Sequence, residues 1–217
     1  MNTSLKTRKL AVTGILTAIA VILGLTPLGY IPIPPIEITL MAIPVLVGVL
    51  VEGLSTGLIL GLVFGATSFL QIFLKTTPLS SLLFSVSPFR TILVVFIPRL
   101  LVPIIAWIVY KAVSGEDREP GKARSNTAYA LSAFAGSITN TVFFLGMMYL
   151  LYQPQAAEIA LIFGTTEAGL FGALSAVGAI NGIPEAIVAV IIVSSVCIAL
   201  RGVQKRIKRS QTNKEIS

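Results

Sequence analysis

Four polar residues lie in apolar stretches of the sequence, where they could bind a small charged molecule. Arg99 follows Pro98 near the middle of an apolar run of membrane-spanning length. A charge at the hydrocarbon centre is costly, so it normally faces a partner, a cavity or a ligand. Asn140, Asn181 and Glu185 lie in two later apolar stretches. Together these side chains offer charge-assisted and neutral hydrogen bonds to a ligand.

Each of these residues also has a purely structural interpretation. Arg99 and Glu185 could neutralise each other as an ion pair. Asn140 could link two helices by a hydrogen bond, and Asn181 could cap the start of a helix. The sequence leaves these alternatives open. Three aromatic residues are expected in the interfacial belts of a membrane protein: Trp107, Tyr149 and Tyr152.

The composition is that of an integral membrane protein. Of 217 residues, 55% are hydrophobic and 12% are charged, and the mean hydropathy is +0.92. Apolar runs of about 20 residues recur, which is the length of a membrane span. The chain has no histidine, one cysteine and, in Asp117, one aspartate, so zinc sites, Ser-His nucleophiles and acidic metal clusters are not expected. We therefore expect no enzyme, no metal and no cofactor.

Six membrane helices are predicted within a single integral membrane domain that covers residues 1–217. Prolines and glycines mark the breaks between them, above all in Thr26-Pro-Leu-Gly-Tyr-Ile-Pro-Ile-Pro-Pro. Residues 75–88 are predicted to form a loop, and residues 153–181 a short amphipathic helix followed by a second short helix or a compact loop. The helices are expected at about residues 10–25, 37–51, 54–74, 89–113, 126–152 and 181–202.

The distribution of basic residues predicts that both termini are cytoplasmic. Lys and Arg gather near the N-terminus, in the loop at 114–125 and in the tail at 203–217. With six helices these segments share one side, which the positive-inside rule assigns to the cytoplasm. The net charge of +7 then reflects topology and contact with the lipid bilayer, not nucleic-acid binding. We expect a multi-pass protein of a bacterial plasma membrane.

This topology places the polar residues in the outer half of one helix bundle. The first loop lies directly over them, and a site with few charges and no nucleophile is typical of binding and transport. The residues expected to bind a substrate are Arg99, Asn140, Thr139, Asn181, Glu185, Tyr30 and Thr26.

The first helix carries Gly14 and Ala18 four positions apart. Small residues at this spacing let another helix approach closely. The partner helix could belong to the same bundle or to another protein.

A series of short motifs extends over most of residues 8–205. They are Gly14-xxx-Ala18, Thr26-Pro-Leu-Gly-Tyr-Ile-Pro-Ile-Pro, Ile43-Pro-Val-Leu-Val-Gly, the glycines 57, 61 and 65, Pro98-Arg99-Leu-Leu, Gly136-Ser-Ile-Thr-Asn-Thr and Asn181-Gly-Ile-Pro-Glu. In order and spacing the chain resembles the substrate-binding (S) components of energy-coupling factor (ECF) vitamin transporters. It is most similar to the pantothenate-specific members.

The resemblance implies a six-helix bundle that captures a vitamin from outside, under its first and fifth loops. It also implies that the face with Gly14 and Ala18 docks onto a transmembrane coupling protein driven by two cytoplasmic ATPases. The family usually has alanines in this docking motif, so Gly14 is a conservative departure that leaves docking plausible.

Pantothenate suits the polar residues of the chain. Arg99 could bind its carboxylate, while Asn140, Thr139, Asn181 and Glu185 could bind its hydroxyl and amide groups. Flat aromatic vitamins are less favoured because Trp107, the one tryptophan, is expected near the cytoplasmic end. The alternatives are another vitamin such as riboflavin or folate, a stand-alone carrier or channel without ATPases, or a scaffold without a small ligand.

Overall fold

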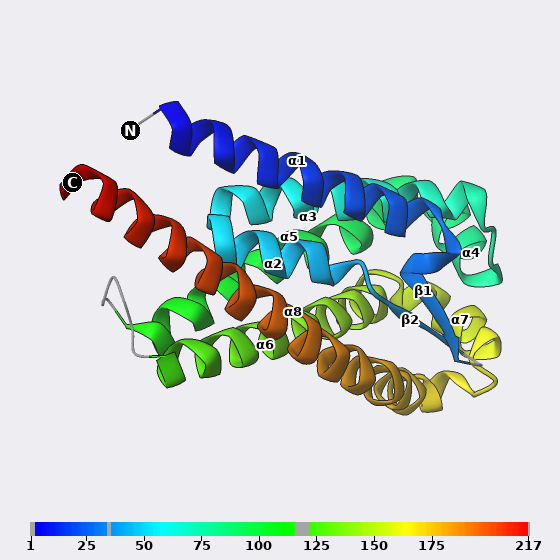
Figure 1. The fold of residues 1–217 in the computed structure, drawn as a ribbon. Coiled ribbons are helices and arrows are strands. Elements are labelled where there is room, and N and C mark those ends of the chain that lie inside the picture. The colour runs from blue at the N-terminus through cyan, green and yellow to red at the C-terminus, as the bar shows by residue number, and fades with distance from the viewer. Residues whose placement is uncertain (1–2, 34–35, 116–121, 217) are drawn as a thin grey trace.

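The computed structural model describes residues 3–33, 36–115 and 122–216. Long helices run side by side, and a small antiparallel hairpin lies at one end of the bundle (Figure 1). The hairpin consists of β1 (Tyr30–Ile33) and β2 (Ile36–Thr39). The helices are α1 (Thr3–Leu25), α2 (Ala42–Glu52), α3 (Leu54–Leu74), α4 (Pro78–Val86), α5 (Pro88–Ser114), α6 (Lys122–Leu151), α7 (Ala156–Ile162) and α8 (Leu170–Ile216).

The fold is that of an all-α, multi-pass membrane protein, as the sequence predicts. Within the described part of the chain, five helices are long and apolar enough to cross a membrane: α1, α3, α5, α6 and α8. Their outward side chains are apolar as well, for example Ile59, Phe89 and Ile187. The sixth apolar helix, α2, has only 11 residues and lies among the longer ones, where it forms the centre of the core.

The helix ends gather at two ends of the bundle (Figure 1). The start of α1, the end of α5, the start of α6 and the end of α8 lie together at the left of the view. The hairpin, α4 and α7 lie at the opposite end. Segments rich in Lys and Arg are therefore at one end, and the connections that contain few of them are at the other.

The hairpin replaces the first turns of a helix that the sequence predicted from residue 37. Tyr30 pairs with Thr39 and Ile33 with Ile36, so the backbone N–H and C=O groups are satisfied by strand pairing. The alternation Ile36-Glu-Ile-Thr suits a strand because β-branched residues favour extended backbone. The predicted helix therefore begins later, at Ala42.

The last helix begins earlier than predicted. The expected start at residue 181 lies inside α8, which is continuous from Leu170 and includes Pro184. Its Gly/Ala-rich first part packs against α6, where Gly178 and Gly182 face the side chain of Thr141. The tail expected from residue 203 also belongs to this helix, which continues to Ile216.

One connection contains more structure than the sequence predicted, whereas the short helix expected within 153–181 is present as α7. The expected loop at 75–88 holds α4, which Thr77 and Ser80 cap by exchanging hydrogen bonds.

Tyr152, expected at the membrane interface, is fully buried. Its hydroxyl lies 2.8 Å from the Thr91 hydroxyl and donates to the carbonyl of Leu83 at 2.9 Å. Tyr152 thus joins α4 and α5 to the end of α6, which is a structural role.

Candidate binding site

Arg99 lies in the middle of α5, beside two prolines that release backbone carbonyls. Pro98 has no N–H to donate to the carbonyl of Val94, and Pro103 has none for the carbonyl of Arg99. The Arg99 guanidinium partly replaces the first bond, because its Nη1 lies 3.5 Å from the Val94 oxygen. The Arg99 carbonyl faces α3 at Gly61, where a Cβ would come within 2.8 Å of it. Arg99 therefore lies where two backbone hydrogen bonds within α5 are missing.

The Arg99 side chain points into the bundle between two aromatic rings. Its Cζ lies 5.2 Å from the ring centroid of Phe64 on α3 and 4.9 Å from that of Phe144 on α6. Phe64 is almost completely buried. Cation–π contacts of this kind stabilise a guanidinium away from water. Arg99 can therefore present a positive charge inside the membrane domain.

Asn140 lies one turn before Phe144 on α6 and is 8% exposed. Its Oδ1 is buried and has no hydrogen-bond partner among the residues that the structure describes. A buried polar atom without a partner is costly, so this oxygen is suited to accept from a ligand. The neighbouring Thr139 is different, because its hydroxyl donates to the Ala135 carbonyl at 2.7 Å and is committed to its own helix.

Glu185 connects α8 to the hairpin. Its Oε1 accepts a hydrogen bond from the backbone N–H of Thr39 at 2.6 Å, and its side chain is 9% exposed. The sequence leaves open whether Glu185 neutralises Arg99 or contacts a ligand. The hydrogen bond of Glu185, however, goes to the chain segment above the site.

The remaining predicted residues take peripheral positions. Asn181 is partly buried, one turn before Glu185 in the interior of α8, so it does not cap a helix start. The Thr26 hydroxyl donates to the Ile22 carbonyl at 2.7 Å at the end of α1. Tyr30 pairs with Thr39 through the hairpin backbone, but its side chain lies outside the described part of the structure.

Sequence reasoning missed three residues of this arrangement. Phe144 could have been found, since it lies four positions after Asn140 and shares its face of the helix. Phe64 and Thr39 could not, because only the packing of α3 on α5 and the formation of the hairpin bring them to Arg99 and Glu185. Within the described residues, no cluster of three Asp, Glu, Cys or His side chains could hold a metal ion.

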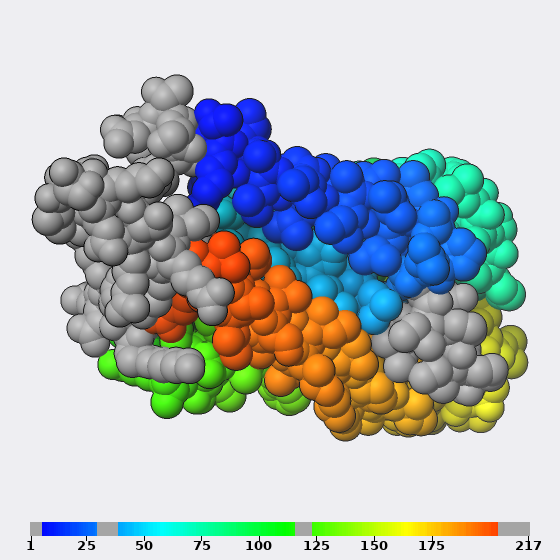
Figure 2. Space-filling view, viewed as in Figure 1, coloured from blue at the N-terminus to red at the C-terminus, as the bar shows by residue number. Residues whose placement is uncertain are grey.

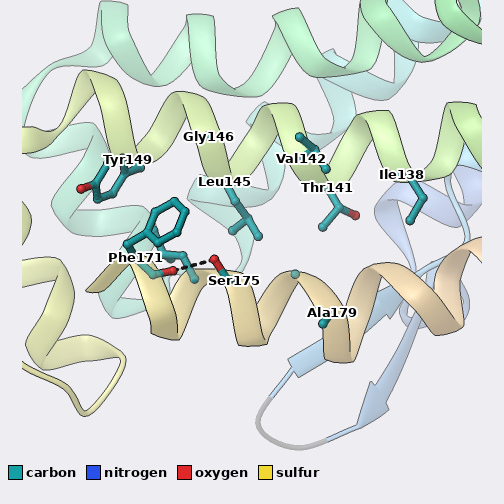
Figure 3. Close-up of a pocket in the computed structure, with 11 residues that line it drawn as sticks. Ile138, Thr141, Val142, Leu145, Gly146, Tyr149, Phe171, Ser175 and Ala179 are labelled. Carbon is teal, nitrogen blue, oxygen red and sulfur yellow. Dashed lines mark hydrogen bonds between the residues drawn. The ribbon is translucent and has the colours of Figure 1, made fainter. Parts of the chain in front are cut away.

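A separate cavity of about 380 Å³ lies between α6 and α8 (Figure 3). Thr141, Leu145 and Tyr149 point into it from one helix, and Phe171 and Ser175 line it from the other. The Ser175 hydroxyl donates to the Phe171 carbonyl at 2.8 Å. The side chains that line this cavity carry no charge and include none of the predicted binding residues. It therefore suits apolar groups and not a carboxylate.

Besides Gly14 and Ala18, α1 carries a second pair of small residues four positions apart, Ala20 and Gly24, and the two pairs face different sides of the helix. A Cβ built at Gly14 meets no atom within 4 Å, and Ala18 is exposed. Ala20 is fully buried, and Gly24 packs against Met41 and Thr67. In Figure 2, α1 runs along one edge of the molecule with its outer surface uncovered in this view. The face with Gly14 and Ala18 is therefore accessible from the membrane.

The chain is thus a multi-pass helical membrane protein with an arginine, an amide and a carboxylate inside its bundle. Residues 8–197 match the family "ECF transporter, substrate-specific component", and the chain belongs to this family of transporter components. A curated relative is the pantothenic acid transporter PanT of Lactococcus lactis subsp. cremoris (strain MG1363). The two are 33% identical over an alignment that covers 76% of this chain and 79% of the relative.

Proposed function

We propose that the chain is the substrate-capturing subunit of an ATP-driven ECF importer and that it binds pantothenate from outside. It delivers the vitamin inward together with a transmembrane coupling protein and two cytoplasmic ATPases. The chain itself catalyses no reaction in this scheme. Family membership supports the transport role, and the name of the relative supports pantothenate as the substrate.

The observation that carries the substrate assignment is the Arg99 guanidinium between Phe64 and Phe144, in the middle of a membrane domain. A permanent positive charge in this position favours a small anion, and a carboxylate can take two parallel hydrogen bonds from it. In this scheme the carboxylate of pantothenate binds Arg99. The unpartnered Oδ1 of Asn140 accepts from an amide or hydroxyl of the ligand.

The hairpin covers the bound vitamin in this proposal. Glu185 holds Thr39 by a hydrogen bond to the backbone, so the hairpin is tied to α8 beside the site. Thr26 and Tyr30 then belong to the segment that leads into the cover, and Thr139 and Asn181 support the walls. The apolar cavity between α6 and α8 lacks a cation among the side chains that line it, so we do not assign the vitamin to it.

The arrangement of helix ends supports a topology with both termini in the cytoplasm. The starts and ends that carry most Lys and Arg residues lie at one end of the bundle, opposite the hairpin (Figure 1). The hairpin and the site beneath it then face the outside. The uncovered face of α1 with Gly14 and Ala18 is the proposed surface for the coupling protein.

The test is calorimetric binding by the purified chain against a panel of vitamins that includes pantothenate, riboflavin and folate. We expect one-to-one binding of pantothenate alone. Tight binding of a different vitamin would reject the substrate but keep the class. Copurification with a coupling protein and two ATPases tests the assembly, and substrate flux in liposomes without any ATPase would instead support a stand-alone carrier.

A further inference from the structure

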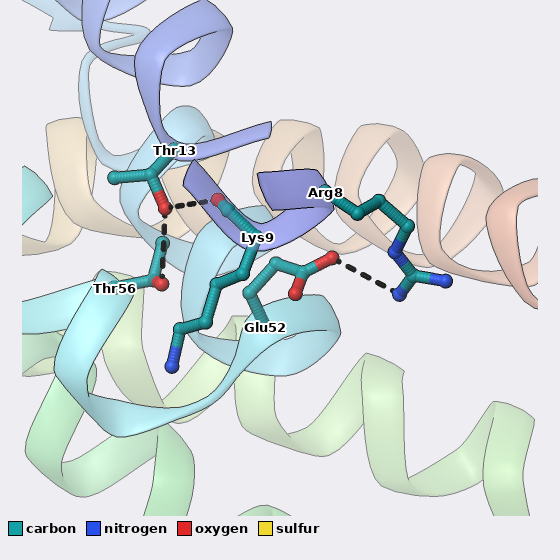
Figure 4. Close-up of polar contacts among 5 residues, drawn as sticks. All are labelled: Arg8, Lys9, Thr13, Glu52 and Thr56. Atoms are coloured by element: carbon teal, nitrogen blue, oxygen red, sulfur yellow. Dashed lines mark hydrogen bonds and ion pairs between the residues drawn. The ribbon is translucent and has the colours of Figure 1, made fainter. Parts of the chain in front are cut away.

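The first turns of α1 are tied to the turn between α2 and α3 and the start of α3 by three polar contacts. Arg8 Nη2 lies 3.3 Å from Glu52 Oε1 (Figure 4). Lys9 Nζ donates to the Ser55 hydroxyl at 2.7 Å. The hydroxyls of Thr13 and Thr56 lie 3.2 Å apart. Since Thr13 already donates to the Lys9 carbonyl at 2.8 Å, the Thr56 hydroxyl is the donor between the two.

Two of the side chains in these contacts, Glu52 and Thr56, are shielded from water. The Glu52 side chain is 7% exposed, while that of Arg8 is 48% exposed, and Thr56 is 1% exposed. A carboxylate in this position depends on its partner more than an exposed one does, because removing the arginine leaves a poorly solvated charge. The ion pair is therefore more than a chance contact between two mobile surface chains.

These contacts matter because α1 is the least buried of the five candidate spans in the described part of the chain. In the apolar window of α1, 17% of the residues are buried, against 28% to 33% in the other four candidate spans. Apolar packing does not favour helix contact over lipid contact inside a membrane, so polar contacts and close packing decide how a helix is seated. Close packing at Ala20 and Gly24, with a hydrogen bond from the Gln71 side chain to the Gly24 carbonyl, seats the second half of α1. The polar contacts of Arg8, Lys9 and Thr13 seat its first turns.

Two of the three anchoring residues lie on the side of α1 opposite the exposed small pair. At 3.6 residues per turn, Lys9, Thr13 and Ala20 share one side, and Gly14 and Ala18 point about 140° to 180° away from Lys9. Arg8 lies between the two sides, about 100° from Lys9. When the side with Lys9 and Thr13 is held against α2 and α3, the direction in which Gly14 and Ala18 point is fixed as well. A rotation of α1 by one residue position would turn Gly14 away by about 100°.

We propose that the Arg8–Glu52 ion pair, with the contacts Lys9–Ser55 and Thr13–Thr56, is a positioning anchor for α1. It sets the rotation of the helix and so presents Gly14 and Ala18 to the coupling protein. The identity of the docking partner rests on the proposed function, whereas the anchoring of α1 does not. Arg8 and Glu52 act through α1 and do not themselves contact the partner or the vitamin.

The anchor can be tested without any partner by a disulfide between α1 and α3. Thr13→Cys and Thr56→Cys, in a Cys197→Ala background, place two thiols where the hydroxyls lie 3.2 Å apart. We expect rapid crosslinking in membranes, slowed at least about threefold by Arg8→Glu. Lys6→Glu is the matched control, since it makes the same charge change on an exposed residue two positions earlier. Arg8→Glu combined with Glu52→Arg should restore the rate.

Assembly is tested separately by copurification with the coupling protein and ATPases, with pantothenate binding as the measure of folding. We expect Arg8→Glu to bind pantothenate normally but to assemble poorly, and the Arg8→Glu/Glu52→Arg pair to recover both crosslinking and assembly. Unchanged crosslinking in Arg8→Glu would overturn the anchor. Recovery of crosslinking without recovery of assembly would mean that Arg8 touches the partner directly, which also overturns it. Failure of the unmodified chain to assemble would reject the proposed function and leave the crosslinking result to decide the anchor.

Discussion

Glu185 on α8 accepts a 2.6 Å hydrogen bond from the backbone N–H of Thr39, the last residue of the hairpin. The two residues are 146 positions apart in the chain. The carboxylate therefore ties the hairpin to α8. A residue that the sequence suggests as a ligand for the vitamin thus also holds the segment that we propose as the cover of the site.

Replacing Glu185 should loosen this cover. Glu185→Leu removes the acceptor of a charge-assisted hydrogen bond, which contributes about 1.5–3 kcal/mol. We expect pantothenate to dissociate roughly tenfold faster or more, measured by displacement of labelled vitamin from the purified chain. Glu185→Gln keeps an oxygen acceptor, so its dissociation rate should increase less than that of Glu185→Leu. Glu158→Leu, at an exposed glutamate of α7, is the control and should release the vitamin at the unmodified rate. Equal rates for Glu185→Leu and the unmodified chain would contradict the role of this bond.

Arg99 should contribute most of the binding free energy of the carboxylate. Arg99→Ala removes the charge between Phe64 and Phe144, and we expect at least about a tenfold loss of affinity in calorimetry. Arg99→Lys keeps the charge but not the planar pair of donors, so an intermediate affinity is expected. Arg90→Ala is a control on the same helix, where the arginine is exposed and donates to the Leu151 carbonyl. A folded Arg99→Ala protein with unchanged affinity would remove Arg99 from the site.

Filling the cavity between α6 and α8 should leave vitamin binding unchanged. A Cβ at Gly146 meets no atom within 4 Å, so Gly146→Leu can project into this cavity without a clash. Because the proposed site lies at Arg99 and Asn140, we expect the same affinity for pantothenate by calorimetry. A strong loss of affinity in Gly146→Leu, with Arg99→Ala unaffected, would move the site to the cavity.

A bulky residue on the outer face of α1 should block assembly without affecting the vitamin site. Gly14→Leu meets no atom of the isolated chain, so we expect normal pantothenate binding. Close helix approach needs small residues, so copurification with the coupling protein should be lost. Gly172→Leu is the matched control, since this glycine of α8 also has open space around it. If both variants assemble normally, the coupling protein docks elsewhere.

Tyr152 should stabilise the end of the bundle near the hairpin. Burial raises the pKa of its hydroxyl, so the group keeps its proton and donates to the Leu83 carbonyl. Tyr152→Phe leaves the Thr91 hydroxyl and this carbonyl without that partner, at a cost of about 1 kcal/mol or more. We expect a midpoint of thermal unfolding lower by roughly 2–4 °C. Tyr149→Phe, at the rim of the cavity, should change the midpoint much less.

Much of the fold could be predicted because its physical cause is local. Apolar runs of span length specify membrane helices. The positions of Lys and Arg predict which helix ends lie on the same side of the membrane. Arg99 was evident as a site residue, since a charge inside such a run needs an explanation. The hairpin was not predicted. Strand pairing between Tyr30–Ile33 and Ile36–Thr39 depends on two segments satisfying each other's backbone groups, which neither segment shows alone.

The sequence by itself determined that this is a multi-pass helical membrane protein of the ECF substrate-binding family, with Arg99, Asn140 and Glu185 inside its apolar segments. Only the tertiary structure decided what each residue touches. It placed Arg99 between Phe64 and Phe144, tied Glu185 to Thr39, and turned Gly14 outward while burying Ala20. Helical periodicity shows which residues share a face. It does not show which face meets the core, because in a membrane both faces are apolar and only the packing of the whole bundle distinguishes them.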